Sequence, residues 1–413
     1  MAKIIVIGAG AAGMMAAITA ARNGKQVVVL EKNDKPGKKL FITGKGRCNV
    51  TNACDLEVLF ENTISNPKFL YSAIYSFDNQ QVMQFFEKLS VPLKTERGDR
   101  VFPQSDHSSD IIRALVREMD RLGVEVIFNS DVVEISLSGD NGVSTVKLKN
   151  GKLLNAKAVI LATGGKSYPL TGSTGSGYEL ATKLGHTVTP LYPALVPLKI
   201  KQEFCKELMG LSLKNVTLTV MQGKRQLYHD FGEMLFTHYG ISGPLVLSAS
   251  SHITKKIGQQ SLQVFIDLKP ALSIEQLDKR ILREFEANVN KQFKNTLGSL
   301  FPSKLIPVMI QLSNIAGDKK INEISKEERM EFVKLIKGLE LEVVDTAGFQ
   351  EAIITQGGIN VKEINPSTME SKIVKGLYFA GEIIDLDAMT GGYNLQIAWS
   401  SGFLAGESAA LQI

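Results

Sequence analysis

Cysteine and histidine are scarce in this sequence, and their scarcity excludes several classes of protein. Three cysteines in 413 residues are an odd number and too few for the disulfide framework of a small secreted domain. We therefore expect a reducing compartment, the cytoplasm. The five histidines form no H-E-x-x-H motif or cluster, and no C-x-x-C pair occurs, so no metal site is predicted.

A large excess of charge of one sign is also missing. The 47 basic and 42 acidic residues leave a net charge of +5, too small over this length to indicate nucleic acid as a partner. The expected partner is a small-molecule substrate, and nothing in the composition indicates an oligomeric state. With 44% hydrophobic and 22% charged residues, the chain is typical of a globular protein, and its length suggests two or three domains.

Apolar runs long enough to span a bilayer are absent, so no membrane segment is expected. The uncharged stretch 4–21 superficially resembles a signal peptide, but three glycines interrupt it. Residues 4–7 are instead typical of a short buried strand, and residues 14–21 of an alanine-rich helix. Together with a second apolar strand at 27–30, they predict a βαβ unit.

Glycine, by contrast, is abundant, and the 36 glycines cluster after apolar runs. The first cluster, Gly8-Ala9-Gly10-Ala11-Ala12-Gly13, is a G-x-G-x-x-G dinucleotide fingerprint between the predicted strand and helix. Its first glycine permits a tight turn, its second lets the backbone approach a pyrophosphate, and its third lets the helix pack on the sheet. The helix start offers amides to the phosphates, and Glu31, after the second strand, is expected to accept hydrogen bonds from ribose hydroxyls.

Later glycine clusters favour FAD over NAD. Residues 159–165 and 377–382 are apolar strands that end in small residues, and strand ends of a parallel sheet line the ligand crevice. Gly391-Gly392-Tyr393-Asn394 opens a helix whose first amides can reach a flavin or pyrophosphate, although a helix start without a ligand fits the same pattern. Because only one G-x-G-x-x-G motif occurs, NADH or NADPH would dock transiently as electron donor, or oxygen would serve as acceptor.

Further segments carry a resemblance to a known family. They are Gly44-Lys45-Gly46-Arg47-Cys48-Asn49-Val50-Thr51-Asn52, Arg100-Val101-Phe102-Pro103, residues 235–244 and residues 368–406. With them the whole chain resembles the bacterial BaiN/YhiN-like flavoproteins, also labelled NAD(FAD)-utilising dehydrogenases or aminoacetone-oxidase-family FAD enzymes. The resemblance implies an α/β fold with a discontinuous Rossmann-type FAD-binding domain, interrupted by a β-barrel-like plus helical insert. It also implies an FAD-dependent oxidoreductase that transfers a hydride through flavin N5.

The pattern along the chain predicts the domain boundaries. The FAD-binding domain is expected at 1–192 and again at 357–413. Alternating apolar residues predict a β-rich insert at 193–272 with 339–356. Helical periodicity with capping boxes at Ser273 and Ser325 predicts a helical subdomain at 273–338.

The residues expected to bind FAD come from the whole first domain and the carboxyl-terminal segment. In chain order they are Gly8, Gly10, Ala11, Ala12, Gly13, Glu31, Lys32, Lys38, Gly44, Arg47, Cys48, Asn49, Val133, Ala162, Thr163, Gly164, Gly165, Gly381, Glu382, Gly392, Tyr393, Asn394, Leu395 and Gln396. Lys38 and Arg47 belong to six cations within residues 32–47, which serve an anionic ligand or are simply solvated. Val133 lies where related flavoproteins give backbone contacts to adenine. Glu382 stands where related flavoproteins usually have aspartate, and a glutamate can still reach a ribityl hydroxyl.

Four more residues are candidates for chemistry. His238 is suited to proton transfer near neutral pH, and Arg100 to binding a carboxylate, although structural roles for both fit the sequence too. Cys48 and Cys54 follow the strand after which glutathione-reductase-type flavoenzymes carry a redox dithiol, but five residues separate them instead of the usual four. Packed or loop cysteines are the alternative.

The resemblance leaves the substrate open. It implies reduction of an enone with NAD(P)H or oxidation of a small amine with oxygen. Two other classes stay possible: an FAD-dependent enzyme that modifies nucleic acid, and a flavin-binding protein without catalysis. The lack of an aromatic and basic RNA-binding motif argues against nucleic acid.

Overall fold

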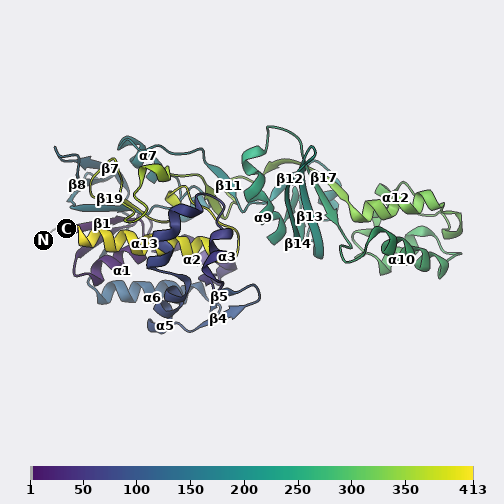
Figure 1. Ribbon diagram of the computed structural model, residues 1–413, viewed down its shortest axis with the longest axis horizontal. Coiled ribbons are helices and arrows are strands. Elements are labelled where there is room, and N and C mark those ends of the chain that lie inside the picture. Colours follow the sequence, from purple (N-terminus) through teal and green to yellow (C-terminus); the bar gives the residue numbers. More distant parts are fainter. Residues whose placement is uncertain (1–2, 413) are drawn as a thin grey trace. The chain divides into compact units, whose positions relative to one another are not determined.

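The computed structural model describes residues 3–412, which form two compact units (Figure 1). The first unit combines the chain up to Ala194 with the chain from Phe349 onward, and the second is Leu195–Gly348. Residues 193–194 and 349–356 thus lie in the first unit, whereas the sequence assigned them to the insert. The reason is that β11 (Tyr192–Ala194) pairs with β18 (Ile354–Gln356), where the chain leaves and re-enters this unit.

A five-stranded parallel sheet forms the centre of the first unit, in the order β19-β10-β1-β2-β6. The strands are β1 (Lys3–Ile7), β2 (Gln26–Leu30), β6 (Glu125–Ile127), β10 (Ala158–Leu161) and β19 (Leu377–Phe379). The inner strands β10, β1 and β2 are buried along almost their whole length, which is why they are continuous apolar runs without alternation. Parallel strands place their carboxyl ends at one edge, so the segments after β1, β10 and β19 meet there.

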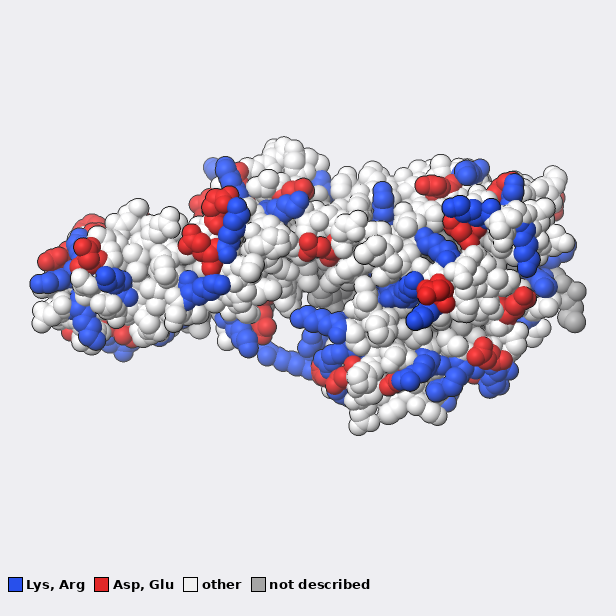
Figure 2. Space-filling model, turned by 180° about the vertical axis from the view of Figure 1, so that it is seen from behind, with Lys and Arg blue, Asp and Glu red and all other residues white. Residues whose placement is uncertain are grey.

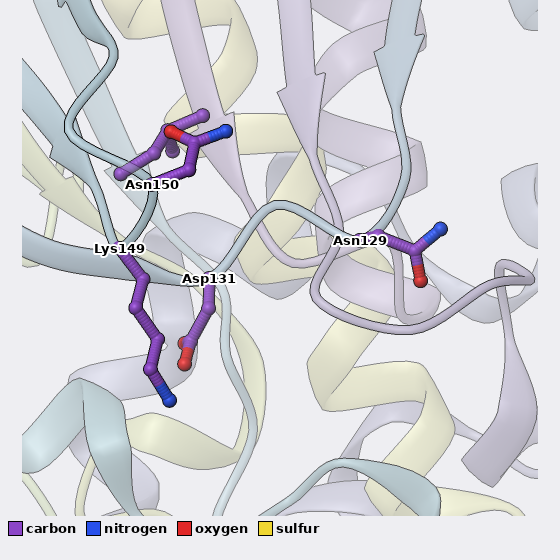
Figure 3. A pocket seen from close by; sticks show the side chains of 5 residues that line it. Asn129, Asp131, Lys149 and Asn150 are labelled. Atoms are coloured by element: carbon purple, nitrogen blue, oxygen red, sulfur yellow. The ribbon is translucent and has the colours of Figure 1, made fainter.

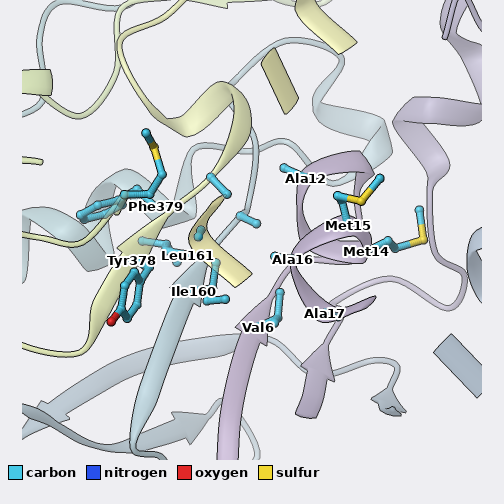
Figure 4. Packing of buried hydrophobic residues seen from close by; sticks show 14 of the residues in the cluster. Val6, Ala12, Met14, Met15, Ala16, Ala17, Ile160, Leu161, Tyr378 and Phe379 are labelled. Carbon is cyan, nitrogen blue, oxygen red and sulfur yellow. The ribbon is translucent and has the colours of Figure 1, made fainter. Parts of the chain in front are cut away.

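Two helices from opposite ends of the chain, α1 (Ala11–Arg22) and α13 (Tyr393–Leu411), pack directly against each other (Figure 1). Glycines allow this approach: a Cβ at Gly402 would lie 2.4 Å from the carbonyl oxygen of Ala12, and Gly406 meets α1 in the same way. Figure 4 shows the alanines and methionines of α1 beside the buried side chains of the sheet. The predicted βαβ unit is confirmed.

Smaller elements complete the first unit. One antiparallel sheet contains β7 (Val132–Leu137), β8 (Val143–Leu148) and β9 (Leu153–Asn155), and another contains β3 (Thr51–Asn52), β5 (Arg100–Pro103) and β4 (Leu93–Glu96). The other helices are α2 (Lys38–Ile42), α3 (Leu56–Glu61), α4 (Tyr71–Ser76), α5 (Asn79–Lys88), α6 (Ser108–Arg121) and α7 (Ser176–Lys183). Among residues 3–412, no helix has both the length and the apolar character needed to cross a membrane.

The second unit is built around a closed six-stranded barrel in the order β12-β15-β14-β13-β16-β17. The strands are β12 (Leu198–Ile200), β13 (Ser212–Gln222), β14 (Arg225–Thr237), β15 (Gly240–Ser242), β16 (Leu262–Asp267) and β17 (Leu339–Thr346). The helices are α8 (Phe204–Glu207), α9 (Pro244–Ile253), α10 (Ile274–Glu286), α11 (Ile306–Ser313) and α12 (Lys326–Lys337). Both capping boxes form, at Ser273 and Ser325. The β-barrel-like plus helical insert is confirmed.

Candidate cofactor site

The turn between β1 and α1 forms a cradle whose three glycines have different surroundings. Gly8 has a φ of +104°, and a Cβ at Gly13 would lie 1.9 Å from the Gly8 carbonyl oxygen, so these two residues close the turn. A Cβ at Gly10 would meet no protein atom within 4 Å. No side chain caps α1, which leaves the first-turn amides, including those of Ala11 and Ala12, for a ligand. An open glycine beside uncapped amides fits a pyrophosphate.

Glu31 lies buried at the carboxyl end of β2, beside this cradle. Its carboxylate accepts hydrogen bonds from the backbone amides of Ala9, at 2.7 Å, and Asn33, at 2.8 Å. These bonds hold the carboxylate where a ribose hydroxyl would meet it in a dinucleotide fold. The neighbouring Lys32 donates to the Thr174 hydroxyl at 2.8 Å, and partial burial lowers the pKa of its ammonium group.

A polar pocket of about 270 Å³ lies near this strand end (Figure 3). Its lining residues are Asn129, Asp131, Leu148, Lys149 and Asn150. The connection from β6 to β7 is tied to β2, because the Ser130 amide donates to the Glu31 carbonyl oxygen at 2.9 Å. Figure 3 shows Asp131 and Lys149 extending to the same side of the pocket. Val133 follows on β7 and is not among these lining residues, so its contact with adenine stays a prediction.

Glu382 receives hydrogen bonds from three segments that are far apart in the sequence. Its Oε1 accepts from the Ser167 hydroxyl at 2.9 Å and from the Thr355 amide at 2.8 Å. Its Oε2 accepts from the Lys39 ammonium at 2.6 Å. Gly165 completes this contact, since a Cβ there would lie 2.8 Å from Glu382 Oε1. The ends of β10 and β19, the start of α2 and the returning strand β18 therefore converge on one carboxylate.

Lys39, and not Lys38, is the lysine of α2 that reaches this cluster. The sequence assigned Lys38 to the cofactor, but Lys38 forms an i,i+4 ion pair with Asp34, whose side chain is 59% exposed. The Lys39 side chain is only 21% exposed. Consecutive residues of a helix point about 100° apart, so one of two adjacent lysines faces inward and the other outward.

Arg47 was also assigned to the cofactor, and the structure gives its charge other partners. Its guanidinium forms ion pairs with Glu96 and Asp106, and Nε donates to Asp106 at 2.7 Å. It also lies over the Phe102 ring, 4.2 Å from the ring centre. The hydrogen bonds that Arg47 donates to Glu96 and Asp106 raise the pKa of its guanidinium. The charge of Arg47 is thus compensated within the chain.

The loop that contains Arg47 has an unusual backbone. Gly44, Lys45 and Cys48 have φ values of +57°, +59° and +59°, a left-handed conformation that costs energy for the two residues with side chains. The next residue, Asn49, has a buried Oδ1 without a hydrogen-bond partner among the described residues, and Thr163 Oγ1 after β10 is in the same situation. Buried polar atoms normally have partners, so Asn49 Oδ1 indicates a ligand that donates a hydrogen bond, and the Thr163 hydroxyl indicates one that either donates or accepts.

Cys48 and Cys54 are free thiols in the structure. Burial raises the pKa of Cys48 to about 12, and partial burial raises the pKa of Cys54. The Cys54 thiol is in hydrogen-bond contact with the Tyr393 hydroxyl. Because thiolates are the reactive form, both environments argue against a redox dithiol.

The start of α13 lies against the β3 segment. Gly392 has a φ of +103°, and a Cβ there would lie 2.4 Å from the Thr51 carbonyl oxygen. The amide of Asn394 donates to the backbone of the preceding loop at 2.8 Å, and that of the fully buried Gln396 donates to the backbone after α4 at 3.0 Å. Both side-chain amides thus donate within the fold, and contacts of Asn394 and Gln396 with FAD stay predictions. The uncapped first-turn amides, including that of Leu395, are left for a ligand.

The two candidates for chemistry lie in different units. His238 is exposed in the turn between β14 and β15, with its ring 4.5 Å from the ring of Tyr239. Arg100 is exposed on β5, where Nε donates to the Arg97 carbonyl oxygen at 3.1 Å. Neither side chain belongs to the cluster around Glu382.

Sequence reasoning missed several residues of this site. Lys39 is one of six neighbouring cations, and only its register in a helix that begins after Gly37 separates it from Lys38. Ser167 follows a predicted strand end, but its small polar side chain carries no signal of its own. Thr355 was assigned to the insert, and its contact with Glu382 arises only when the chain returns to the first unit.

Comparison with known proteins also indicates a flavoprotein with a Rossmann-type domain. The chain matches the family model described as the HI0933-like protein Rossmann domain over residues 2–408. It is 35% identical over 413 residues to a 3-dehydro-bile acid delta(4,6)-reductase of Clostridium scindens, covering 99% of both chains. It is 34% identical over 412 residues to a ribosomal RNA dihydrouridine synthase of Haemophilus influenzae, covering 99% of this chain and 98% of that one.

Solved structures show the same fold at low sequence identity. A 3-ketosteroid delta1-dehydrogenase from Sterolibacterium denitrificans has a TM-score of 0.54 and 14% identity, with all of both chains covered. A flavocytochrome c3 fumarate reductase in an open conformation has a TM-score of 0.50 and 18% identity, with 99% of this chain and 78% of that chain covered. The fold and family define an FAD-binding oxidoreductase with a Rossmann-type domain. The chain belongs to the HI0933-like family, which confirms the resemblance drawn from its motifs.

Proposed function

We propose that this protein is an FAD-dependent reductase that transfers a hydride through flavin N5 to a carbon–carbon double bond conjugated with a carbonyl group. The observation that carries the proposal is a chemistry shared by two relatives that span the whole chain. By their names, one reduces double bonds conjugated with a ring ketone, and the other saturates the double bond of uracil beside a carbonyl. Their substrates differ in size and polarity, but the accepting group is the same.

The chain's own residues are proposed to position the cofactor and to exclude water. FAD, when bound, supplies a hydride at N5, and the protein supplies orientation and electrostatics. The open backbone at Gly10 and the amides of α1 hold the pyrophosphate, and Glu31 accepts a hydrogen bond from the ribose. Asn49 Oδ1 and the amides of α13 hold the flavin ring.

Reduction of such a double bond needs a proton as well as a hydride. The hydride adds to the carbon far from the carbonyl group, and the proton adds to the carbon beside it. We assign the proton to His238, because histidine is the side chain that most often serves as a general acid and this one is exposed. Arg100 is proposed to bind an acidic group of the substrate. NADH or NADPH is proposed as the electron donor, docking transiently.

The test is anaerobic reduction and reoxidation of the FAD-loaded protein, followed by the visible absorbance of the flavin. NADH or NADPH should reduce the flavin, and a 3-oxo steroid with a 4,5 double bond should reoxidise it and gain two hydrogens. The saturated 3-oxo steroid is the matched control and should leave the flavin reduced. Reduction by small amines, with no reoxidation by any enone, would show an amine oxidase instead. A flavin that no donor reduces would show a binding protein without catalysis.

Ribosomal RNA is a second candidate substrate, although the sequence argued against nucleic acid. It is favoured by two relatives, at 34% and 31% identity, that are named ribosomal RNA dihydrouridine synthases. On the face shown in Figure 2, basic and acidic side chains are interspersed, which suits a small substrate better than a phosphate backbone. Formation of dihydrouridine in isolated ribosomal RNA, with binding that weakens steeply with salt, would favour RNA as the substrate.

A further inference from the structure

Three aromatic side chains form a cluster on the surface of the first unit. Phe60 lies near the end of α3, and Tyr71 and Tyr75 lie one turn apart on α4. The Phe60 ring meets the Tyr71 ring edge to face, with 4.6 Å between the ring centres, and its centre is 6.2 Å from that of Tyr75. The Tyr71 and Tyr75 ring centres are 6.4 Å apart. We call these three residues the aromatic cluster.

Much of the aromatic cluster is in contact with solvent. Tyr71 is 46% exposed and Tyr75 is 64% exposed, whereas Ala73 and Ile74 of the same helix are fully buried. The buried face of α4 packs against α13, so the two tyrosines lie on its outer side. Single exposed apolar residues are common, but adjacent exposed aromatic rings with polar residues around them are typical of a binding surface.

The segment between α3 and α4 is joined to a loop of the candidate cofactor site. The amide of Ile64 donates to the Asp387 carbonyl oxygen at 2.8 Å, and the Asn66 side chain donates to the Asp385 carbonyl oxygen at 2.7 Å. Asp385 and Asp387 lie in the chain between Glu382 and the start of α13. The aromatic cluster is therefore anchored to the segment that precedes the amides proposed to hold the flavin ring.

The charges around the aromatic cluster narrow the choice of ligand. Residues 55–78 contain four acidic residues and one lysine, and the side chains of Asp55, Glu57 and Glu61 are exposed. This excess of negative charge repels a phosphate backbone, whereas surfaces that stack nucleic-acid bases combine aromatic rings with a basic groove. Among ligands without phosphate, the proposed reaction supplies the uncharged, flat ring system of a cyclic enone.

We propose that the aromatic cluster binds the apolar rings of a fused-ring ketone, so that the substrate is a polycyclic enone and not a small one. The inference rests on the enone reduction proposed above and adds the part of the substrate that does not react. Contact with the cluster removes apolar area from water in the bound substrate and in the transition state alike. The cluster should therefore lower KM and leave kcat unchanged.

Two enones separate the binding of the rings from the reaction itself. A 3-oxo steroid with a 4,5 double bond carries the fused rings, whereas cyclohexenone carries only the reacting ring. The Tyr75→Ser variant should raise KM for the steroid about tenfold, with kcat and the kinetics of cyclohexenone unchanged. Tyr75→Phe keeps the ring and should retain the wild-type KM. Leu153→Ser is the matched control, because Leu153 is 61% exposed on β9 of the same unit.

Equilibrium dialysis of the oxidised, FAD-loaded protein with the saturated 3-oxo steroid measures binding without turnover. Tyr75→Ser should bind this steroid about tenfold more weakly than the wild type, a result that supports the cluster even if neither enone is reduced. Reduction of both enones with an unchanged steroid KM in Tyr75→Ser would refute the cluster and leave the proposed function intact.

Other outcomes would also overturn the proposal. The wild type would then fail to bind the steroid, or Tyr75→Ser would impair both enones equally, which indicates an effect on the flavin. Loss of ribosomal RNA binding in Tyr75→Ser, with steroid affinity unchanged, would assign the surface to RNA. Dissociation of a wild-type dimer by the same substitution, again with steroid affinity unchanged, would assign it to a second copy of the chain.

Discussion

Gly402 in α13 lies so close to Ala12 in α1 that a Cβ at residue 402 would sit 2.4 Å from the Ala12 carbonyl oxygen. Gly406 stands in the same relation to Ala16, at 2.3 Å. Two helices separated by almost the whole chain therefore touch backbone to backbone. This contact fixes the start of α1, where the phosphate cradle lies, against the helix that closes the other side of the site.

A side chain at residue 402 should push these helices apart. We expect Gly402→Ala to lower the free energy of unfolding by about 1–3 kcal/mol, because a close-packed interior has no room for an added methyl group. Urea denaturation of the apoprotein measures the loss. Gly139→Ala is the control, since a Cβ there would meet nothing within 4 Å, and an equal loss in both variants would contradict the explanation.

Substitutions at two glycines of the cradle should have different effects, one on FAD binding and the other on the stability of the fold. Gly10→Ala should leave the melting temperature of the apoprotein nearly unchanged, because the added Cβ meets no protein atom, yet it should weaken FAD binding by blocking the pyrophosphate. Gly13→Ala should instead destabilise the apoprotein, because its Cβ would lie 1.9 Å from the Gly8 carbonyl oxygen. If Gly10→Ala binds FAD like the wild type, the cradle does not hold the pyrophosphate.

Stability should fall in mild acid because of one buried histidine. The His186 ring contacts the Ser371 hydroxyl at 2.8 Å through Nε2 and the Glu363 carboxylate at 3.3 Å through Nδ1. Burial lowers the pKa of His186 below 6.5, an effect that Glu363 opposes. The folded state therefore binds a proton less readily than the unfolded chain. The contribution of His186 to stability is complete above pH 6.5 and is lost as the pH falls through its lower folded value.

The predicted fall of stability with falling pH can be checked by urea denaturation between about pH 5 and pH 8. The wild type should lose stability toward the acid end, and His186→Gln, which cannot titrate, should show a shallower slope over the same range. His107→Gln is the control, because His107 is exposed and should not change the slope. Identical slopes for the wild type and His186→Gln would exclude His186 as the cause.

His238 is expected to matter for turnover and not for cofactor binding. His238→Ala should retain FAD and reduce the rate of enone reduction by about 10²–10⁴-fold, the usual contribution of general acid catalysis. Steady-state rates of enone reduction measure this loss. His229→Ala, an exposed histidine of the same barrel, is the matched control. If His238→Ala reduces the enone as fast as the wild type does, His238 is not the proton donor.

The sequence by itself determined the class of the protein and much of its fold. The structures of three features depend only on residues close in the sequence. These features are the fingerprint from Gly8 to Gly13, the apolar strand runs, and the capping boxes at Ser273 and Ser325. Turn geometry, strand burial and helix capping are local, so spacing alone predicts them. For the same reason the distinct surroundings of Gly10 and Gly13 agree with the roles that the motif gives them.

The tertiary structure alone decided how individual side chains are used. The sequence favoured a cofactor role for Arg47, and the fold pairs its charge with Glu96 and Asp106, which lie about 50 to 60 residues away in the chain. Gln396 was expected to bind FAD, but its amide is buried against backbone more than 300 residues earlier. Lys39 reaches Glu382 across 343 residues of chain. Sequence periodicity gives the direction of a side chain within its own element, whereas its partners depend on which distant segments the fold brings beside it.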